Sequence, residues 1–282
     1  MLDANLAPDE AKLEYLAKAA SGRQTILDLV QRNDPLEVTE IIDRFKLEEM
    51  LDSNEQDNDF IGSFLYYFGM LTLAGERETG ERLLTIPNLV IRGLYVAHLR
   101  KRLLPLGTDQ DEGRRRAREL YAEGRIEPLC RFVEKKLFCV FKNRDYRWMN
   151  EFSLRMAFLT LLHNDLLYMI DTEEEIERGY ADLVMIVRPD MRRFSILDIV
   201  LEFKYVGLKE AGLTAEEARS LEAGEVRALP AVEKAFSSAR KQLSRYAQGL
   251  HDKYGEMLRL RTFAVVSLGF ERILGEEAGR RE

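Results

Sequence analysis

Two apolar segments in the C-terminal half of the sequence carry charged side chains that could do chemistry together. The segment at 194–206 reads FSILDIVLEFKYV, and the segment at 180–187 reads YADLVMIV, with Asp182 as its only charged residue. Side chains alternate between the two faces of a strand, so Glu202 and Lys204 share one face. An unpaired charge buried among apolar groups is costly, and these groups therefore need a partner or a chemical use.

Pairing of the two segments as antiparallel strands would supply that partner, because Asp182 would join Glu202. Two carboxylates from adjacent strands can hold one divalent cation through hard oxygen ligands, which suits Mg²⁺ or Mn²⁺. Such a metal polarises a phosphate and lowers the pKa of a bound water, while Lys204 orients that nucleophile or steadies developing charge. The spacing alone leaves a second interpretation open, a partly buried Asp-Lys or Glu-Lys ion pair that closes the end of a sheet.

The elements that must position these residues form a compact α/β pattern. From about residue 149 onward, apolar periodicity indicates helices and strands, and turn residues separate them. Between the second strand and the next helix, Thr214 and Glu217 fit a capping box. The predicted elements are, in order, an apolar helix at 150–164, strands at 180–187 and 194–206, a helix at 230–255 and a buried strand at 262–270.

The N-terminal half predicts helices instead. Apolar residues recur at helical spacing within 8–50, and the aromatic and aliphatic block at 60–73 is typical of buried core. The polar stretch at 74–83 reads as a loop, and 85–105 reads as a turn that enters a helix closed by Pro105. We therefore predict an all-helical linker or partner domain over 1–145, followed by an α/β domain over 146–282.

The charge distribution is uneven along the chain. The formal net charge is −7 and the pI is near 5.3, which argues against a protein that binds nucleic acid over its whole surface. Between Arg100 and Arg147, however, fourteen Lys or Arg face eight Asp or Glu, a local excess of +6. This segment is a candidate footprint for phosphates. Solvated helix faces in ordinary proteins carry similar runs, so that simpler interpretation stays open.

The order of Asp182, a hairpin and then Glu202-Phe203-Lys204 resembles the D…ExK core of the PD-(D/E)XK nucleases, the restriction-endonuclease-like superfamily. The resemblance implies an α/β fold with a restriction-endonuclease-like core, in which helices flank a central mixed sheet. It also implies that Asp182, Glu202 and Lys204 are catalytic. Ala181 stands where the name motif has proline, a departure that leaves the implied metal ligand intact.

Two flanking features fit the same resemblance. Glu151 stands where this superfamily often has an acidic residue that helps to hold metal, so the implied ligands are Glu151, Asp182 and Glu202. Gln242 and Tyr246 match the QxxxY motif of the recombination-exonuclease branch, which implies a catalytic role for Gln242 and a substrate-positioning role for Tyr246. Because they are four residues apart, they share one helix face.

Two further features concern the protein in which this domain occurs. One is the insert between the motifs, and the other is the N-terminal half of the chain. The 37 residues between Lys204 and Gln242 exceed the spacing expected for this branch, which leaves the placement of Gln242 open. The stretch at 60–95 resembles the linker of bacterial AAA-ATPase-like proteins that end in a PD-(D/E)XK nuclease domain. No GxxxxGK[ST] motif occurs, so an AAA-type ATPase domain was either removed or never part of the protein.

The sequence as a whole favours a metal-dependent nuclease that hydrolyses phosphodiester bonds, with DNA preferred to RNA as substrate. The alternative is a catalytically inactive interaction module of the same fold, associated with an ATPase. No run of about 20 apolar residues and no secretory signal is visible, so we expect a cytoplasmic protein without a membrane span.

Overall fold

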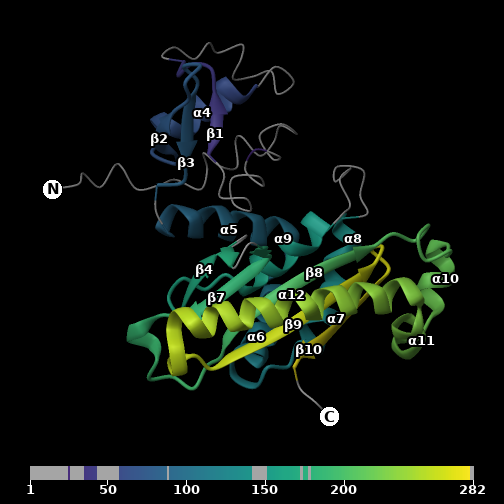
Figure 1. The fold of residues 1–282 in the computed structure, drawn as a ribbon. Helices are drawn as coiled ribbons and strands as arrows, with labels where there is room; N and C mark the ends of the chain where they lie inside the picture. The colour runs from purple at the N-terminus through teal and green to yellow at the C-terminus, as the bar shows by residue number, and fades with distance from the viewer. Residues whose placement is uncertain are drawn as a thin grey trace. The chain divides into compact units, whose positions relative to one another are not determined.

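The computed structural model describes residue 25 and the ranges 35–42, 57–87, 89–141, 151–171, 174–176 and 179–279. It divides into two compact units, Met1–Arg102 and Leu103–Glu282, each with a sheet of its own (Figure 1).

The N-terminal unit contains a small three-stranded sheet. Its strands are antiparallel and lie in the order β1-β3-β2. Its described helices and strands are β1 (Leu36–Val38), α4 (Asn58–Tyr67), β2 (Thr72–Glu76), β3 (Arg82–Thr85) and α5 (Leu89–Leu103). Helix α4 begins where the Asp57 carboxylate accepts a hydrogen bond from the Phe60 N–H at 2.8 Å. Gly62 allows α4 to approach β1 closely, since a Cβ there would lie 2.5 Å from Val38 Cγ1.

This sheet corrects the prediction of an all-helical domain before residue 146. Strands β2 and β3 form a hairpin across the stretch that we predicted to be a loop, and β1 lies within a segment that we predicted to be helical. The hairpin turns at Gly80, whose φ of 97° suits glycine, and the Gly80 N–H donates to the Arg77 carbonyl. Every residue of β2 is exposed, so apolar periodicity could not reveal this strand. The helices predicted at 8–34 and 43–50 lie outside the described residues, except at Thr25.

The C-terminal unit is built on a five-stranded mixed sheet. The strand order is β10-β9-β8-β7-β4, with β8 and β9 parallel and the other neighbours antiparallel. A separate ribbon pairs β5 with β6. Its helices are α6 (Gly107–Glu123), α7 (Glu127–Lys136), α8 (Phe138–Phe141), α9 (Glu151–Leu162), α10 (Ala215–Ser220), α11 (Ala223–Ala228) and α12 (Pro230–Tyr254), with short 3-10 turns at Pro189–Met191 and Gly255–Met257. Its strands are β4 (Tyr168–Asp171), β5 (Glu174–Ile176), β6 (Gly179–Ala181), β7 (Leu183–Val187), β8 (Asp198–Val206), β9 (Leu260–Leu268) and β10 (Arg272–Ala278).

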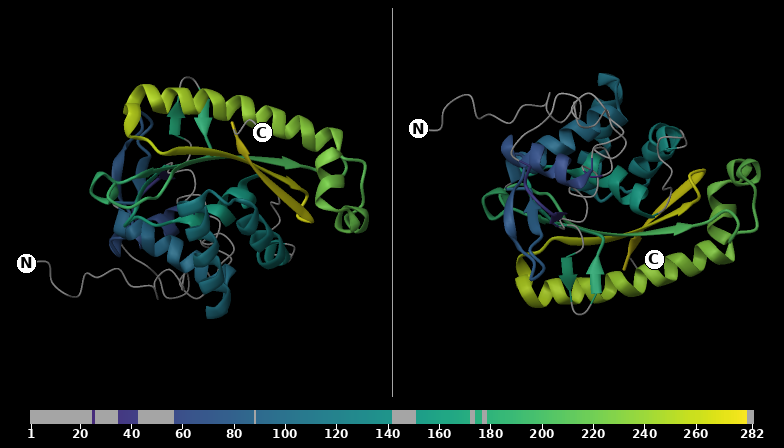
Figure 2. Two further views of the ribbon diagram at one scale, coloured as in Figure 1. Left: turned by 90° about the horizontal axis from the view of Figure 1, so that it is seen from below. Right: turned by 90° about the horizontal axis from the view of Figure 1, so that it is seen from above.

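Helices cover both faces of this sheet (Figure 2). Helix α12 lies along one face, and α7 and α9 pack on the other, with α6 beside them. The buried side chains of α12 recur every three or four residues, as in Phe236, Ala239 and Leu243, so that one stripe faces the sheet. On the opposite face the rings of Phe158 and Phe203 lie 5.1 Å apart. Strand β8 is thus buried on both sides.

The predicted elements of the α/β domain are confirmed in α9, β7, β8, α12 and β9. The antiparallel pairing of β7 with β8 and the capping box of Thr214 and Glu217 are confirmed as well. Strands β4 and β10 were not predicted. The domain boundary between residues 145 and 146 stays a prediction; the compact units divide after Arg102, and α7 packs against β10 within the second unit.

Asp198, at the start of β8, ties three chain segments together. It is fully buried, and its carboxylate accepts hydrogen bonds from the Val187 and Arg259 N–H groups, each at 2.8 Å. The Arg192 guanidinium donates to both of its oxygens, at 2.6 and 2.8 Å. This clamp fixes the start of β8 against the end of β7 and the start of β9.

Replacing Asp198 with alanine should therefore destabilise the protein strongly. Asp198→Ala leaves the Arg192 charge and two backbone N–H groups without their acceptor, and we expect a loss of roughly 3 to 5 kcal/mol in denaturant unfolding. Asp190→Ala in the same connection is the control, because the Asp190 side chain is 60% exposed; its effect should stay within about 0.5 kcal/mol. Equal losses in the two variants would contradict the clamp.

Candidate active site

The register of the sheet brings Asp182 and Glu202 together. The β7–β8 pairing ends at Leu183 with Leu201, and Asp182 and Glu202 follow this pair directly, close enough for the charge of Asp182 to act on Glu202. Val200, Ala264 and Val266 belong to the apolar layer between the sheet and α12. Because Glu202 alternates in phase with Val200, its carboxylate lies in that same layer.

Both oxygens of the Asp182 carboxylate have partners. Oδ2 accepts a hydrogen bond from the Phe203 N–H at 2.8 Å, and Oδ1 lies 2.9 Å from Nη2 of Arg155. Asp182 itself is buried. The first contact locks Asp182 to the strand that carries Glu202, and the second brings in a cation from helix α9.

Glu202 and Lys204 form an ion pair that is buried at one end. Lys204 Nζ donates to Glu202 Oε1 at 2.7 Å; the Glu202 side chain is 1% exposed and that of Lys204 is 21% exposed. The second oxygen of Glu202, Oε2, is buried and has no hydrogen-bond partner among the described residues. The pair therefore presents one unsatisfied carboxylate oxygen inside the site and an ammonium group that reaches toward solvent.

Burial and neighbouring charges shift the pKa values of both groups. Burial, together with the charge of Asp182, raises the pKa of Glu202 to about 7, although Lys204 opposes this rise. For Lys204, burial lowers the pKa, but Glu202, Glu151 and Asp182 outweigh it and leave the pKa above its usual value. Lys204 thus stays protonated at neutral pH, whereas the ionised form of Glu202 is disfavoured unless further positive charge lies nearby.

Glu151 enters the site from the first turn of α9. Burial raises its pKa; the charge of Asp182 adds to this rise, whereas Lys204 and Arg155 oppose it. The Glu151 carboxylate accepts a hydrogen bond from the backbone N–H of Tyr205, which follows Lys204 on β8. A carboxylate at a helix N-terminus also interacts favourably with the helix dipole. The structure therefore brings Glu151 into the same electrostatic group as Asp182 and Lys204.

Gln242 and Tyr246 reach the site from α12 on the opposite side. Tyr246 is buried, and its hydroxyl is hydrogen-bonded to the Gln242 side chain. Burial raises the pKa of Tyr246, and the charges of Glu202 and Asp182 raise it further. The long insert, which left the placement of Gln242 open in the sequence, folds into the short helices α10 and α11. Helix α12 therefore still packs over β8. All six predicted site residues therefore converge.

Sequence reasoning missed Arg155. Its side chain is 11% exposed, and Nη2 lies 2.9 Å from Asp182 Oδ1 and 3.9 Å from Glu151 Oε1. The available signal was the spacing of Glu151 and Arg155, four residues apart on a predicted helix, which puts both side chains on one face. In the sequence this pair looks like an ordinary surface ion pair.

The residues present suit a hard divalent cation. Glu151, Asp182 and Glu202 offer carboxylate oxygens, the donors that Mg²⁺ and Mn²⁺ prefer, and Glu202 Oε2 is buried with no hydrogen-bond partner in the described part of the chain. Within the described part of the chain, no three Asp, Glu, His or Cys side chains are already gathered closely enough to hold a metal. Arg155 and Lys204 instead hold carboxylate oxygens at 2.9 and 2.7 Å. The chemistry of the donors fits, and the final positions of the ligands depend on these two cations.

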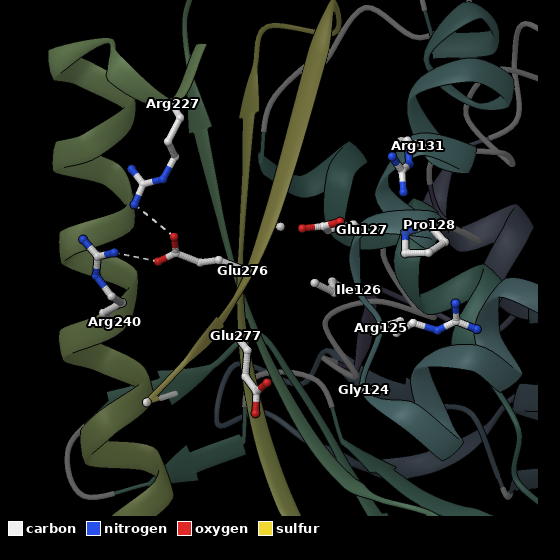
Figure 3. Close-up of a pocket in the computed structure, with 12 residues that line it drawn as sticks. Gly124, Arg125, Ile126, Glu127, Pro128, Arg131, Arg227, Arg240, Glu276 and Glu277 are labelled. Carbon is white, nitrogen blue, oxygen red and sulfur yellow. Dashed lines mark hydrogen bonds and ion pairs between the residues drawn. The ribbon is translucent and has the colours of Figure 1, made fainter. Parts of the chain in front are cut away.

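A polar cavity of about 1090 Å³ lies elsewhere in the C-terminal unit, over β10 (Figure 3). Arg227 and Arg240 point into it from α11 and α12, and both are ion-paired with Glu276 on β10, at 2.9 and 2.7 Å. None of the predicted site residues lines this cavity. Arg227 and Arg240 are thus already balanced by an acid.

The basic segment that we considered as a phosphate footprint is also largely paired where it is described. Arg116 lies 3.2 Å from both Glu112 and Glu119, and Lys136 lies 2.8 Å from Asp109. These pairs on α6 and α7 favour the interpretation as solvated helix faces, and a phosphate footprint stays a prediction. Residues 142–150 lie outside the described residues.

Comparison with known families bears on the class of this domain. A family profile described as PD-(D/E)XK nuclease superfamily matches residues 149–277, which run from α9 to β10 and include all six predicted site residues. This match identifies a PD-(D/E)XK nuclease superfamily domain in the C-terminal part of the chain and suggests a phosphodiester hydrolase that acts on nucleic acid. Nucleases of this superfamily typically use divalent metals.

Other comparisons add nothing to this assignment. No curated protein and no solved structure matched the chain. The resemblance of the N-terminal half to AAA-ATPase-like proteins therefore stays a prediction. No described helix has both the length and the apolar character that a membrane span requires.

The burial of Glu202 predicts an unusual effect on stability. A carboxyl whose pKa is raised in the folded protein disfavours folding at pH values above that pKa, so neutralising it should stabilise. In metal-free buffer at pH 8 we expect Glu202→Gln to be more stable than the wild type by about 1 to 3 kcal/mol in denaturant unfolding.

Glu210→Gln, at an exposed position in the connection after β8, serves as the control and should change stability by less than about 0.5 kcal/mol. A Glu202→Gln protein that is clearly less stable than the wild type would contradict this account of the site.

Proposed function

We propose that the domain at 149–277 is a divalent-metal-dependent nuclease that hydrolyses phosphodiester bonds in DNA. The observation that carries this proposal is the buried Glu202 carboxyl, with one oxygen held by Lys204 and the other without a partner among the described residues, directly beside Asp182. A group arranged in this way weakens the fold, which supports a role in chemistry over a purely structural one. The family match to nucleases supports the same conclusion.

Glu151, Asp182 and Glu202 would hold the cation, for which Mg²⁺ and Mn²⁺ are the candidates. When bound, a divalent cation there supplies Lewis-acid polarisation of a phosphate oxygen and makes a nearby water more acidic. The protein's part is to hold these three carboxylates in place, two of them buried, with Asp182 fixed to the Phe203 N–H and Glu151 fixed to the Tyr205 N–H.

In this proposal the protonated Lys204 side chain acts as a hydrogen-bond donor. Hydrolysis adds the oxygen of water to phosphorus and breaks one P–O ester bond, so that negative charge builds on the phosphate oxygens. The Lys204 ammonium, kept protonated by three carboxylates and partly exposed, can donate to those oxygens or to the attacking water. Gln242, linked to the Tyr246 hydroxyl, would position the substrate or Lys204 from the α12 side.

The charge balance of the site supports a phosphodiester as the substrate. When all are ionised, the carboxylates of Glu151, Asp182 and Glu202 exceed the cations of Arg155 and Lys204 by one negative charge. One divalent cation would turn this into a single net positive charge, which one phosphodiester group neutralises. DNA is the proposed substrate, and RNA belongs in the same assay as the comparison.

Cleavage of labelled single- and double-stranded DNA and RNA in Mn²⁺ tests the proposal. We expect the wild type to cleave DNA, and Asp182→Asn and Lys204→Met to lose at least about 100-fold in rate, because each removes a group that contacts ligand or developing charge. Asp190→Asn, an exposed carboxylate outside the site, should cleave at the wild-type rate. Equal cleavage by the wild type and both site variants would rule out this site.

A catalytically inactive module attached to an ATPase is the competing proposal. The observation that favours it is the Arg155 guanidinium, which already holds the Asp182 oxygen that a metal would need. Calorimetric titration with Mn²⁺ separates the two proposals. A nuclease should bind Mn²⁺ and lose binding in Glu202→Ala, whereas absent binding, or binding unchanged in Glu202→Ala, would support the module. The linker or partner role of the region at 1–145 and the cytoplasmic location stay predictions.

A further inference from the structure

Arg155 is a charged side chain of the site that the proposed reaction does not use. It projects from the first half of α9, is 11% exposed, and contacts Asp182 Oδ1 at 2.9 Å and Glu151 Oε1 at 3.9 Å. It thus touches two of the three carboxylates that would hold the metal. Lys204 is paired with the third, Glu202, at 2.7 Å.

The position of Arg155 balances charge when no metal is bound. The buried carboxylates of Asp182 and Glu202 and the half-buried carboxylate of Glu151 repel one another, and a guanidinium between two of them offsets part of that cost. An arginine side chain does not lose its proton in a protein, so Arg155 cannot relieve a conflict with an incoming cation by becoming neutral. The only ways to relieve such a conflict are movement of its side chain or weaker binding of the cation.

Asp182 is where this conflict arises. Its Oδ2 is held by the Phe203 N–H, and its Oδ1 faces Arg155. A divalent ion that takes Oδ1 as a ligand would come close to the guanidinium, and like charges at that distance repel strongly. Glu202 Oε2 has no such competitor among the described residues.

We propose that Arg155 is a positioning residue that competes with the divalent cation for Asp182 and thereby sets the metal affinity of the site. The inference rests on the proposed function, since it assumes that Asp182 and Glu202 bind the metal. Arg155 holds the carboxylates together before the cation arrives and yields Oδ1 when it binds. Removing its charge tightens metal binding, the opposite of what loss of an ordinary supporting residue does.

Calorimetric titration with Mn²⁺ of the wild type, Arg155→Met and Arg155→Gln tests this inference. We expect both variants to bind Mn²⁺ roughly 10-fold more tightly than the wild type, because the competing charge is gone. Arg155→Gln keeps an N–H donor for Asp182, so it separates the effect of charge from that of the hydrogen bond. Arg116→Met, which removes an arginine paired with Glu112 and Glu119 on α6, is the control and should bind as the wild type does.

Thermal unfolding provides a second measurement that does not depend on activity. Without metal, Arg155→Met should unfold at a lower temperature than the wild type. Saturating Mn²⁺ should raise the melting temperature of the variant by more than it raises that of the wild type. A variant that folds only when Mn²⁺ is present would support the inference as well. A variant that stays unfolded in Mn²⁺, or that binds Mn²⁺ with unchanged or lower affinity, would overturn it.

The failure of this inference is distinguishable from failure of the proposed function. If wild-type Mn²⁺ binding is absent or does not depend on Glu202, the proposed metal site itself is wrong. If wild-type binding depends on Glu202 but the Arg155 variants bind no more tightly, only the competition by Arg155 is wrong.

Discussion

The constraint on which the site depends is the burial of two carboxylates side by side in an otherwise apolar layer. Asp182 directly precedes β7, and Glu202 lies on β8 beside Val200 and Ala264, in the layer that α12 covers. Such burial is costly unless positive charge or hydrogen bonds compensate it. The surrounding structure supplies part of that compensation, and Glu202 Oε2, which has no partner among the described residues, is the oxygen that we propose for the metal.

Each neighbouring element contributes to this compensation in a different way. Strand β8 supplies Lys204 and the Phe203 N–H, and α9 supplies Arg155. The buried Asp198 shows the contrasting case on the same strand, because it has a full set of donors and thus needs no metal. The two aspartates therefore differ: Asp198 holds the strands together, whereas Asp182 is the one that we propose as a metal ligand.

The sequence predicts much of this domain because its signals are local. Alternation along 194–206 placed Glu202 and Lys204 on one face, and the four-residue spacing of Gln242 and Tyr246 placed them together on a helix. The N-terminal sheet was not predicted, because the residues of β2 are all exposed and β1 pairs with β3, a strand far along the sequence. Arg155 was missed for a related reason: its contact with Asp182 depends on tertiary packing, which no spacing pattern contains.

The most direct test of the account is a crystal structure grown with Mn²⁺ and measured at the manganese absorption edge. The proposed metal site requires an anomalous peak between the carboxylates of Asp182 and Glu202, with Glu151 close by and Arg155 moved away from Asp182 Oδ1. If Mn²⁺ were absent from this position while Arg155 and Lys204 kept their present contacts, the metal site proposed here would be contradicted.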